Sequence, residues 1–232
     1  MTQSTKRSTM NLGLTLIIAS FTTLVSCAQR ETPNKIMTTT ATATATALTS
    51  GSATMDTATL ANGCFWCTEA IFQQLEGVLK VTSGYSGGHV VNPTYKEVCT
   101  GTTGHAECIQ IVFDPSKISF DELLSVFWQT HDPTTLNKQG NDEGPQYRSA
   151  VFYHNEEQKA KALKYKEELS KSGAFDRPIV TEISPFTSFY AAENYHQDYY
   201  NQNGSQPYCY FVIRPKLEKF EKVFKDKLKK TH

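Results

Sequence analysis

A C-x-x-C motif begins at Cys64 and ends at Cys67, and this spacing is typical of redox-active cysteine pairs. A turn sequence, Asn62-Gly63, precedes the motif, and apolar residues follow it at helical spacing as far as Leu75. We therefore expect Cys64 at the N-terminus of a helix, where free backbone N–H groups and the helix dipole stabilise a thiolate. The thiolate is the nucleophilic form of cysteine, so the motif predicts thiol redox chemistry at Cys64.

Two aromatic residues, Phe65 and Trp66, separate the cysteines. Beside a reactive thiol, such side chains suit a small apolar substrate group such as a methyl group. From spacing alone, aromatic residues on a first helical turn more often belong to the core, so the spacing leaves both interpretations open.

The other cysteines of the folded part show no pattern of a metal site. A structural zinc ion needs four ligands, usually in closely spaced pairs. Cys99, Cys108 and Cys209 are scattered, and neither a second C-x-x-C nor a His-x-x-x-His is present. The sequence therefore predicts no metal site. We interpret Cys99 and Cys108 as structural, because free cysteines usually behave as small buried hydrophobic residues.

Strand and helix patterns around the motif lack a strict repeat. Strand patterns cover residues 57–61, 78–85, 105–113, 149–153 and 179–183. Helix patterns cover residues 64–75, 119–130, 156–170, 191–200 and 217–228. The clearest helix start is the capping box of Ser119 and Glu122, and the clearest helix end is Gly173. These patterns predict an α+β fold, with helices packed on one mixed or largely antiparallel sheet.

The composition fits one folded domain. The chain has 232 residues, of which 39% are hydrophobic and 11% aromatic, enough for one substantial core. Lys and Arg together number 23, as do Asp and Glu, so the net charge is zero. This balance excludes the basic footprint of a nucleic-acid-binding protein. Because the sequence carries no oligomerisation motif, we expect a monomer.

The amino terminus resembles an export signal. Lys6 and Arg7 precede an apolar run from Leu12 to Val25, which is too short for a comfortable transmembrane span. The run leads into a sequence similar to the lipobox of bacterial lipoproteins, Leu24-Val25-Ser26-Cys27. This resemblance implies a lipoprotein signal peptide at residues 1–26, a lipid on Cys27, and an exported protein anchored in the bacterial cell envelope, periplasmic or on the outer face. The alternatives are an ordinary cleavable signal, in which Cys27 is incidental, and an uncleaved anchor helix.

Residues 27–56 are rich in Thr, Ala and Ser and include an Ala-Thr repeat at residues 41–46. Such a segment buries too little surface to offset its ordering entropy, so we expect a disordered tether. The catalytic domain is then expected at residues 57–232.

Seven motifs of the folded part occur in the same order in the peptide methionine sulfoxide reductase A family, which residues 57–225 resemble. The motifs are residues 63–69 (GCFWCTE), 84–88 (GYSGG), 93–99 (PTYKEVC), 101–107 (GTTGHAE), 131–134 (HDPT), 139–149 (QGNDEGPQYRS) and 192–197 (AENYHQ). The resemblance implies a two-layer α/β plait. It also implies a thiol-dependent repair enzyme that reduces the S epimer of methionine sulfoxide, in proteins and free, to methionine.

By position, the resemblance assigns five residues to this reaction. Cys64 matches the nucleophile, and Glu107 matches the acid that protonates the sulfoxide oxygen as it leaves. Tyr95 and Tyr147 match phenols that hold this oxygen, and Asp142 matches a carboxylate near the site. The two aromatic residues between the cysteines match the walls that receive the substrate methyl group.

The role assigned to Glu107 requires a protonated carboxyl, because an unprotonated oxide is a poor leaving group. Its apolar neighbours on the predicted strand, Ala106, Cys108 and Ile109, predict a buried carboxyl with a raised pKa. Without the resemblance, a solvent-facing strand residue would be the simpler interpretation.

Reduction of the substrate leaves Cys64 as a sulfenic acid, which a second thiol converts into a disulfide. Cys67 lies one helical turn away, while Cys209 matches a C-terminal position where many family members carry a resolving cysteine. We favour Cys67, and the two can act in sequence to pass the disulfide to a thioredoxin-like reductant. The resemblance implies no metal or organic cofactor.

Two other functions fit parts of the sequence. A thiol–disulfide exchange protein would use Cys64 and Cys67 without a sulfoxide site, but it leaves Glu107 without a role. A noncatalytic, lipid-tethered module that binds the cell envelope would leave Cys64 inert, with a thiol pKa near that of free cysteine.

Overall fold

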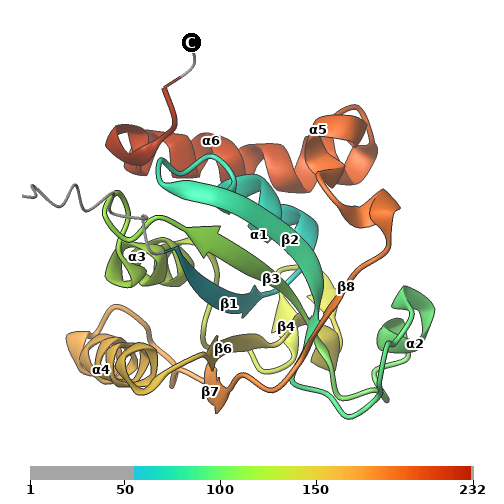
Figure 1. The fold of residues 1–232 in the computed structure, drawn as a ribbon, viewed down its shortest axis with the longest axis horizontal. Coiled ribbons are helices and arrows are strands. Elements are labelled where there is room, and N and C mark those ends of the chain that lie inside the picture. The colour runs from blue at the N-terminus through green and yellow to red at the C-terminus, as the bar shows by residue number, and fades with distance from the viewer. Residues whose placement is uncertain (1–54, 231–232) are drawn as a thin grey trace, which may run out of the picture. The chain divides into compact units, whose positions relative to one another are not determined.

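The computed structural model describes residues 55–230, which form a curled sheet with helices packed on it (Figure 1). The sheet has the strand order β7–β6–β1–β3–β2–β8. Its strands are β1 (Asp56–Asn62), β2 (Val78–Ser86), β3 (Ala106–Phe113), β6 (Ser149–Tyr153), β7 (Glu182–Pro185) and β8 (Phe189–Ala191). Neighbouring strands are antiparallel except β6 and β7, which run parallel. The mixed, largely antiparallel sheet and the α+β class are therefore confirmed.

Alternation along the strands buries both faces of the sheet, because successive side chains point to opposite sides. Leu60 and Val151 belong to the larger core cluster, which also contains buried side chains of the helices. Their neighbours Ala61 and Phe152 belong to a smaller cluster on the other face, against which Phe189 packs. The larger core therefore lies between the sheet and the helices.

The helices are α1 (Phe65–Phe72), α2 (Tyr95–Cys99), α3 (Phe120–Thr130), α4 (Glu156–Ser172), α5 (Tyr199–Asn203) and α6 (Arg214–Val223). Helix α1 contacts β2 and β3 on one side and α5 and α6 on the other. In Figure 1, α6 runs along the top of the view and α5 lies beyond its right-hand end. The helix that carries the C-x-x-C motif is therefore enclosed within the core.

The clearest local signals of the sequence are confirmed. Ser119 caps α3, since its hydroxyl accepts the Glu122 N–H at 3.2 Å while the Glu122 carboxylate accepts the Ser119 N–H at 2.8 Å. Helix α4 ends at Gly173, whose φ of +72° lies in the left-handed region that glycine adopts without strain.

The predicted helix at residues 191–200 is wrong. Ala191 is the last residue of β8, where it pairs with Gly84 of β2. A single 3-10 turn follows at Asn194–His196. The helix proper, α5, starts only after Asp198, which adopts a φ of +50° and interrupts the helical path.

Three other predicted boundaries also need correction. Strand β7 begins at Glu182 rather than residue 179, because Val180 donates its N–H to the Pro133 carbonyl in the loop after α3. Helix α1 ends at Phe72 rather than residue 75. The last helix, predicted at residues 217–228, continues directly from a π-helical segment, Cys209–Ile213, and ends at Val223.

Several short elements carry no helix or strand prediction from the sequence. They are α2, the hairpin of β4 (Lys138–Gln139) and β5 (Asp142–Glu143), and a 3-10 turn at Pro145–Tyr147. Each of these supplies a residue to the site described below.

The predictions for residues 1–26, for Cys27 and for most of the tether at residues 27–56 lie outside the described residues. Among the helices of residues 55–230, none is both long enough and apolar enough to cross a membrane.

Candidate active site

Cys64 is the N-cap residue of α1, as predicted. Its carbonyl accepts the N–H groups of Cys67 at 3.1 Å and Thr68 at 3.3 Å, and only 7% of the residue is exposed. The preceding Gly63 adopts a φ of +96°, and a Cβ at this position would lie 2.7 Å from the Gln139 side chain. Glycine therefore permits the sharp turn that delivers Cys64 from β1 to the start of α1.

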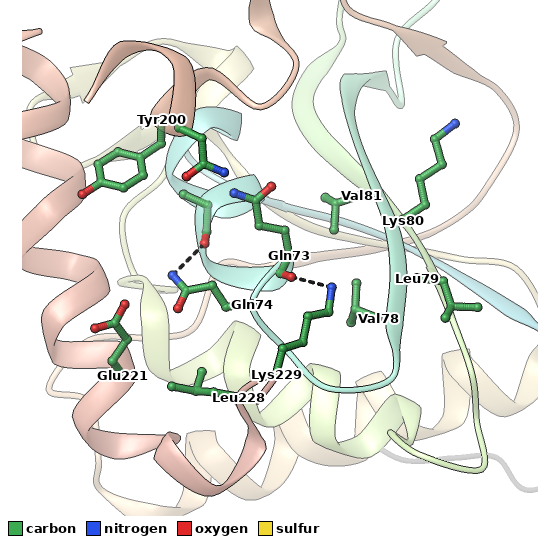
Figure 2. A pocket seen from close by; sticks show the side chains of 12 residues that line it. Gln73, Gln74, Val78, Leu79, Lys80, Val81, Tyr200, Glu221, Leu228 and Lys229 are labelled. Carbon is green, nitrogen blue, oxygen red and sulfur yellow. Dashed lines mark hydrogen bonds between the residues drawn. The ribbon is translucent and has the colours of Figure 1, made fainter. Parts of the chain in front are cut away.

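A small cavity of about 90 Å³ brings together seven of the predicted residues. Its lining consists of Cys64, Phe65, Trp66, Tyr95, Glu107, Asp142 and Tyr147, together with Tyr208. This volume suits the end of a side chain rather than a large ligand. By contrast, the larger groove of about 730 Å³ between α1, β2 and the C-terminal segment contains no predicted site residue (Figure 2).

Glu107 is buried on β3, with only 1% of the residue exposed. Burial raises the pKa of its carboxyl to about 8, although its Oε2 accepts the Phe65 N–H at 3.1 Å, which acts in the opposite direction. Glu107 therefore holds a proton at neutral pH, and its backbone partner places that carboxyl beside the start of α1. The raised pKa expected from its apolar neighbours is found.

The two cysteines of the motif differ in acidity. Burial, followed by the hydrogen bond and the charge of Cys67, raises the pKa of Cys64, which outweighs the effect expected from the helix N-terminus. The hydrogen bond from Cys64 lowers the pKa of Cys67 to about 7 against the effect of burial, and the charge of Lys216 also lowers it. The first proton to leave this pair therefore leaves Cys67.

Tyr95 and Tyr147 enter the cavity from α2 and from the 3-10 turn after β5. Burial is the main cause that raises the pKa of each phenol, so both keep their protons at neutral pH. Protonated hydroxyl groups can donate hydrogen bonds to an oxygen bound in the cavity.

Tyr208 is a site residue that the sequence analysis missed. Its hydroxyl donates to Asp142 Oδ2 at 2.8 Å and lies 3.9 Å from Cys67 Sγ. Asp142 therefore acts at least in part by holding Tyr208. Its position directly before Cys209 is the only signal in the sequence that could have found it.

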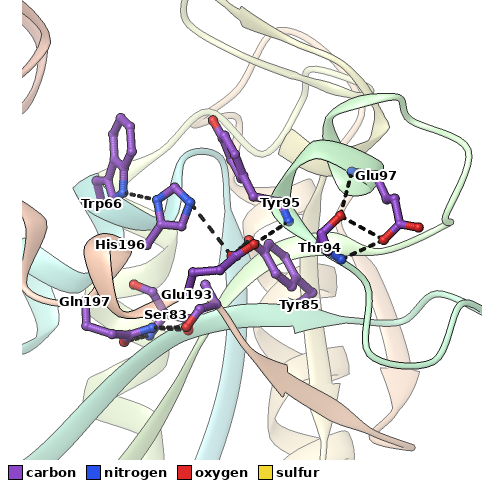
Figure 3. Close-up of polar contacts among 10 residues, drawn as sticks. Trp66, Ser83, Tyr85, Thr94, Tyr95, Glu97, Glu193, His196 and Gln197 are labelled. Carbon is purple, nitrogen blue, oxygen red and sulfur yellow. Dashed lines mark hydrogen bonds and ion pairs between the residues drawn. The ribbon is translucent and has the colours of Figure 1, made fainter.

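Trp66 is held in place by two residues from the segment that was predicted as a helix. Its Nε1 donates to His196 Nδ1 at 3.1 Å (Figure 3). Its ring stacks on Tyr199 at 3.8 Å between centroids. Burial lowers the pKa of His196, so the ring is neutral and carries its proton on Nε2. The indole therefore has a fixed orientation at the cavity.

Glu193, which precedes the 3-10 turn of Asn194–His196, links this turn to Tyr85 and Tyr95, as Figure 3 shows. Its carboxylate accepts the Tyr85 hydroxyl at 3.1 Å and the Tyr95 N–H at 2.9 Å. Helix α2 is further fixed by a capping box of Thr94 and Glu97. Glu193 therefore sets the position of the turn that presents Tyr95.

The remaining cysteines fall outside the cavity lining. Cys209 is fully buried at the start of the π-helical segment, where burial and the neighbouring Cys67 raise its pKa. Cys108 is buried, as predicted. The interpretation of Cys99 as a buried residue is wrong, because it is exposed at the end of α2, where Val98 is the buried residue.

Comparison with known proteins identifies the family to which the chain belongs. Residues 56–228 match the family model of peptide methionine sulfoxide reductase. The chain belongs to the peptide methionine sulfoxide reductase family. The predicted enzymatic activity, reduction of methionine sulfoxide, is thereby confirmed.

Two sequence relatives match the reductase over at least 90% of their own length. Peptide methionine sulfoxide reductase MsrA of Saccharolobus solfataricus is 55% identical over 175 residues, which are 75% of this chain and 98% of the relative. MsrA 1 of Rhodopirellula baltica is 57% identical over 174 residues, 75% of this chain and 90% of the relative. Among solved structures, reduced Mxr1 from Saccharomyces cerevisiae has a TM-score of 0.63 and 37% identity over 68% of this chain and 91% of its own. Methionine sulfoxide reductase A of Corynebacterium diphtheriae has a TM-score of 0.59 and 36% identity over 66% of this chain and 77% of its own.

The described part of the reductase contains no candidate metal site. Within residues 55–230, no group of three His, Cys, Asp or Glu side chains is arranged to hold a metal ion.

Proposed function

We propose that the protein reduces the S epimer of methionine sulfoxide, in proteins and free, by attack of Cys64 on the substrate sulfur. The observation that carries the proposal is the cavity in which Cys64 lies with the protonated Glu107. The Glu107 proton passes to the sulfoxide oxygen, this oxygen moves from the substrate sulfur to the Cys64 sulfur, and the proton of the Cys64 thiol passes to the Glu107 carboxylate. Methionine leaves with its sulfur reduced by two electrons, and Cys64 is left oxidised by two electrons as a sulfenic acid.

Cys67 resolves this sulfenic acid in the proposed sequence. Its thiol shares a hydrogen bond with Cys64, and its pKa of about 7 makes a thiolate available at neutral pH. The charge of Cys67 raises the pKa of Cys209. In the proposed sequence a second exchange follows, in which the disulfide moves from Cys64–Cys67 to Cys67–Cys209. A thioredoxin-like protein then reduces the disulfide.

The test is methionine formation from the separated S and R epimers with dithiothreitol. We expect turnover of the S epimer alone, loss of turnover in Cys64→Ser, and a loss of about a hundredfold in Glu107→Gln. Exposed Glu218 on α6 provides a matched control, since Glu218→Gln should keep full activity. Turnover of the R epimer, or full activity without Cys64, would contradict the proposal. Disulfide exchange without turnover of either epimer would favour the thiol–disulfide exchange protein.

Export and membrane attachment form a second part of the proposal. The charged and apolar residues before Leu24-Val25-Ser26-Cys27 support a lipoprotein signal peptide, with lipid on Cys27 and a place in the cell envelope. In a bacterial host, Cys27→Ser should move the protein from the membrane fraction to the soluble fraction. Retention in the membrane fraction would contradict lipid attachment. We also expect a monomer, which light scattering can check.

A further inference from the structure

Lys216 on α6 reaches the C-x-x-C motif from outside the cavity. Its Nζ lies 3.6 Å from Cys67 Sγ, and its side chain is half-buried between two hollows of about 570 and 250 Å³. Among the salt bridges of residues 55–230, none includes Lys216. In the described part of the chain, the Lys216 ammonium group therefore donates to the sulfur of Cys67 and forms no ion pair with a carboxylate.

Other charged and polar groups around Cys67 act in both directions. The thiol of Cys64 and the hydroxyl of Tyr208 hydrogen-bond to its sulfur and favour the thiolate, whereas burial and the charge of Asp142 oppose it. The thiol of Cys209 also lies within electrostatic range. Among these groups around Cys67, Lys216 carries the full positive charge.

We propose that Lys216 is a positioning residue that holds Cys67 as a thiolate and thereby sets the rate at which Cys67 attacks the Cys64 sulfenic acid. The inference rests on the resolving role proposed above for Cys67. The Cys67 sulfur supplies the electron pair of the new S–S bond, and the S–O bond of Cys64 breaks. The departing hydroxide takes a proton from solvent and leaves as water, so that Cys67 is oxidised and the Cys64 sulfur is reduced.

The first experiment measures the acidity of Cys67 directly. In full-length Cys64→Ser protein, iodoacetamide labelling of the Cys67 peptide is followed by mass spectrometry across pH. We expect Lys216→Met to move the labelling midpoint upward by about one pH unit, as loss of an adjacent opposite charge does. Lys216→Arg should restore it, and Lys219→Met, on the exposed side of the same helix, should leave it unchanged.

A midpoint that stays in place in Lys216→Met would overturn the inference. An equal shift in Lys219→Met would also overturn it, because the effect would then belong to the general charge of α6 rather than to contact with Cys67.

The second experiment uses single turnovers at pH 7 in chains that retain Cys64. We expect Lys216→Met to form the Cys64–Cys67 disulfide about fivefold more slowly, since one unit of pKa moves the thiolate from about half to about a tenth of the population. Cys64 sulfenic acid, trapped with dimedone, should accumulate, and a shift to pH 9 should restore the rate. Unchanged disulfide formation would overturn the inference. Absence of methionine formation by the unsubstituted chain would instead overturn the proposed function, while the labelling profile would still decide whether Lys216 stabilises the thiolate.

Discussion

The pKa values of two residues at the site are shifted in opposite directions. The pKa of Glu107 is raised to about 8 because its carboxyl is buried. The pKa of Cys67 is lowered to about 7, first by the hydrogen bond from Cys64 and then by Lys216, against burial. Glu107 keeps its proton below about pH 8, and Cys67 loses its proton above about pH 7. A protonated Glu107 and an ionised Cys67 therefore coexist mainly between about pH 7 and 8. The residue chemistry therefore favours slightly alkaline conditions.

This coexistence predicts a bell-shaped pH dependence of thiol-coupled turnover. The rate should rise as Cys67 ionises through about pH 7 and fall as Glu107 loses its proton through about pH 8, because only the acid form can protonate the leaving oxygen. In Glu107→Gln the residual rate should lose the alkaline fall, and in Lys216→Met the acid limb should move upward. Steady-state rates from pH 5 to 10 check this, and a Glu107→Gln profile that keeps the alkaline fall would contradict the assignment.

The same carboxyl predicts how stability depends on pH. The pKa of Glu107 is higher in the folded protein than the ordinary value of 4.5, so unfolding releases a proton between about pH 4.5 and 8. The contribution of Glu107 to the free energy of unfolding is therefore full below that window and falls as pH rises through it. Glu107→Gln should remove this fall. Urea unfolding at several pH values measures the free energy of unfolding as a function of pH. The same pH dependence in the unsubstituted protein and in Glu107→Gln would contradict the raised pKa of Glu107.

At the scale of elements, the turn from β1 into α1 determines where Cys64 stands. Gly63→Ala should lower the free energy of unfolding by about 2 kcal/mol or more, because the new Cβ combines a left-handed backbone with a contact to Gln139 at 2.7 Å. Gly140→Ala is the matched control, since Gly140 also has a positive φ but nothing lies within 4 Å of its added Cβ. That variant should lose about 1 kcal/mol. Equal losses in the two variants would show that the close contact contributes nothing.

The 3-10 turn of Asn194–His196 predicts an effect on substrate binding. His196→Phe removes the acceptor of the Trp66 N–H, so the indole loses its fixed orientation at the cavity. We expect KM for methionine sulfoxide to rise about tenfold with a smaller change in kcat, which corresponds to about 1.4 kcal/mol. The exposed neighbour offers a control, since Tyr195→Phe should leave KM unchanged. A fall in kcat alone would show that His196 acts on the chemical step instead.

Elements with strong local signals could be predicted from the sequence, and those fixed by distant partners could not. The capping box of Ser119 and the apolar pattern of β3 each specify their element locally. In contrast, residues 189–191 form a strand because β2 offers them a free edge, which no local pattern encodes. The site follows the same division. The C-x-x-C motif and the family motifs name seven lining residues, whereas Tyr208 reaches the cavity only through the packing of the C-terminal segment on α1.

At the scale of the whole molecule, the described part contains both a complete core and a complete site. The larger core cluster joins the sheet to α1, α3 and α6, and every residue lining the cavity falls between residues 64 and 208. The family match, residues 56–228, has nearly the same limits as the described part. The activity therefore belongs to this part of the chain, and the preceding residues are expected to determine location.

This division predicts the result of removing residues 1–54. The shortened protein should keep kcat for free methionine sulfoxide within about twofold and its melting temperature within about 2 °C, because no element of the core or the cavity is removed. If Cys27 carries the proposed lipid, turnover of a membrane-bound oxidised protein should fall relative to the full-length chain, since the loss of the anchor removes its high local concentration. A full-length Cys27→Ser chain is the control that separates the lipid from the rest of the segment. If the shortened protein lost activity on free methionine sulfoxide while Cys27→Ser kept it, the removed residues 1–54 would have to contribute to activity, which would contradict the prediction.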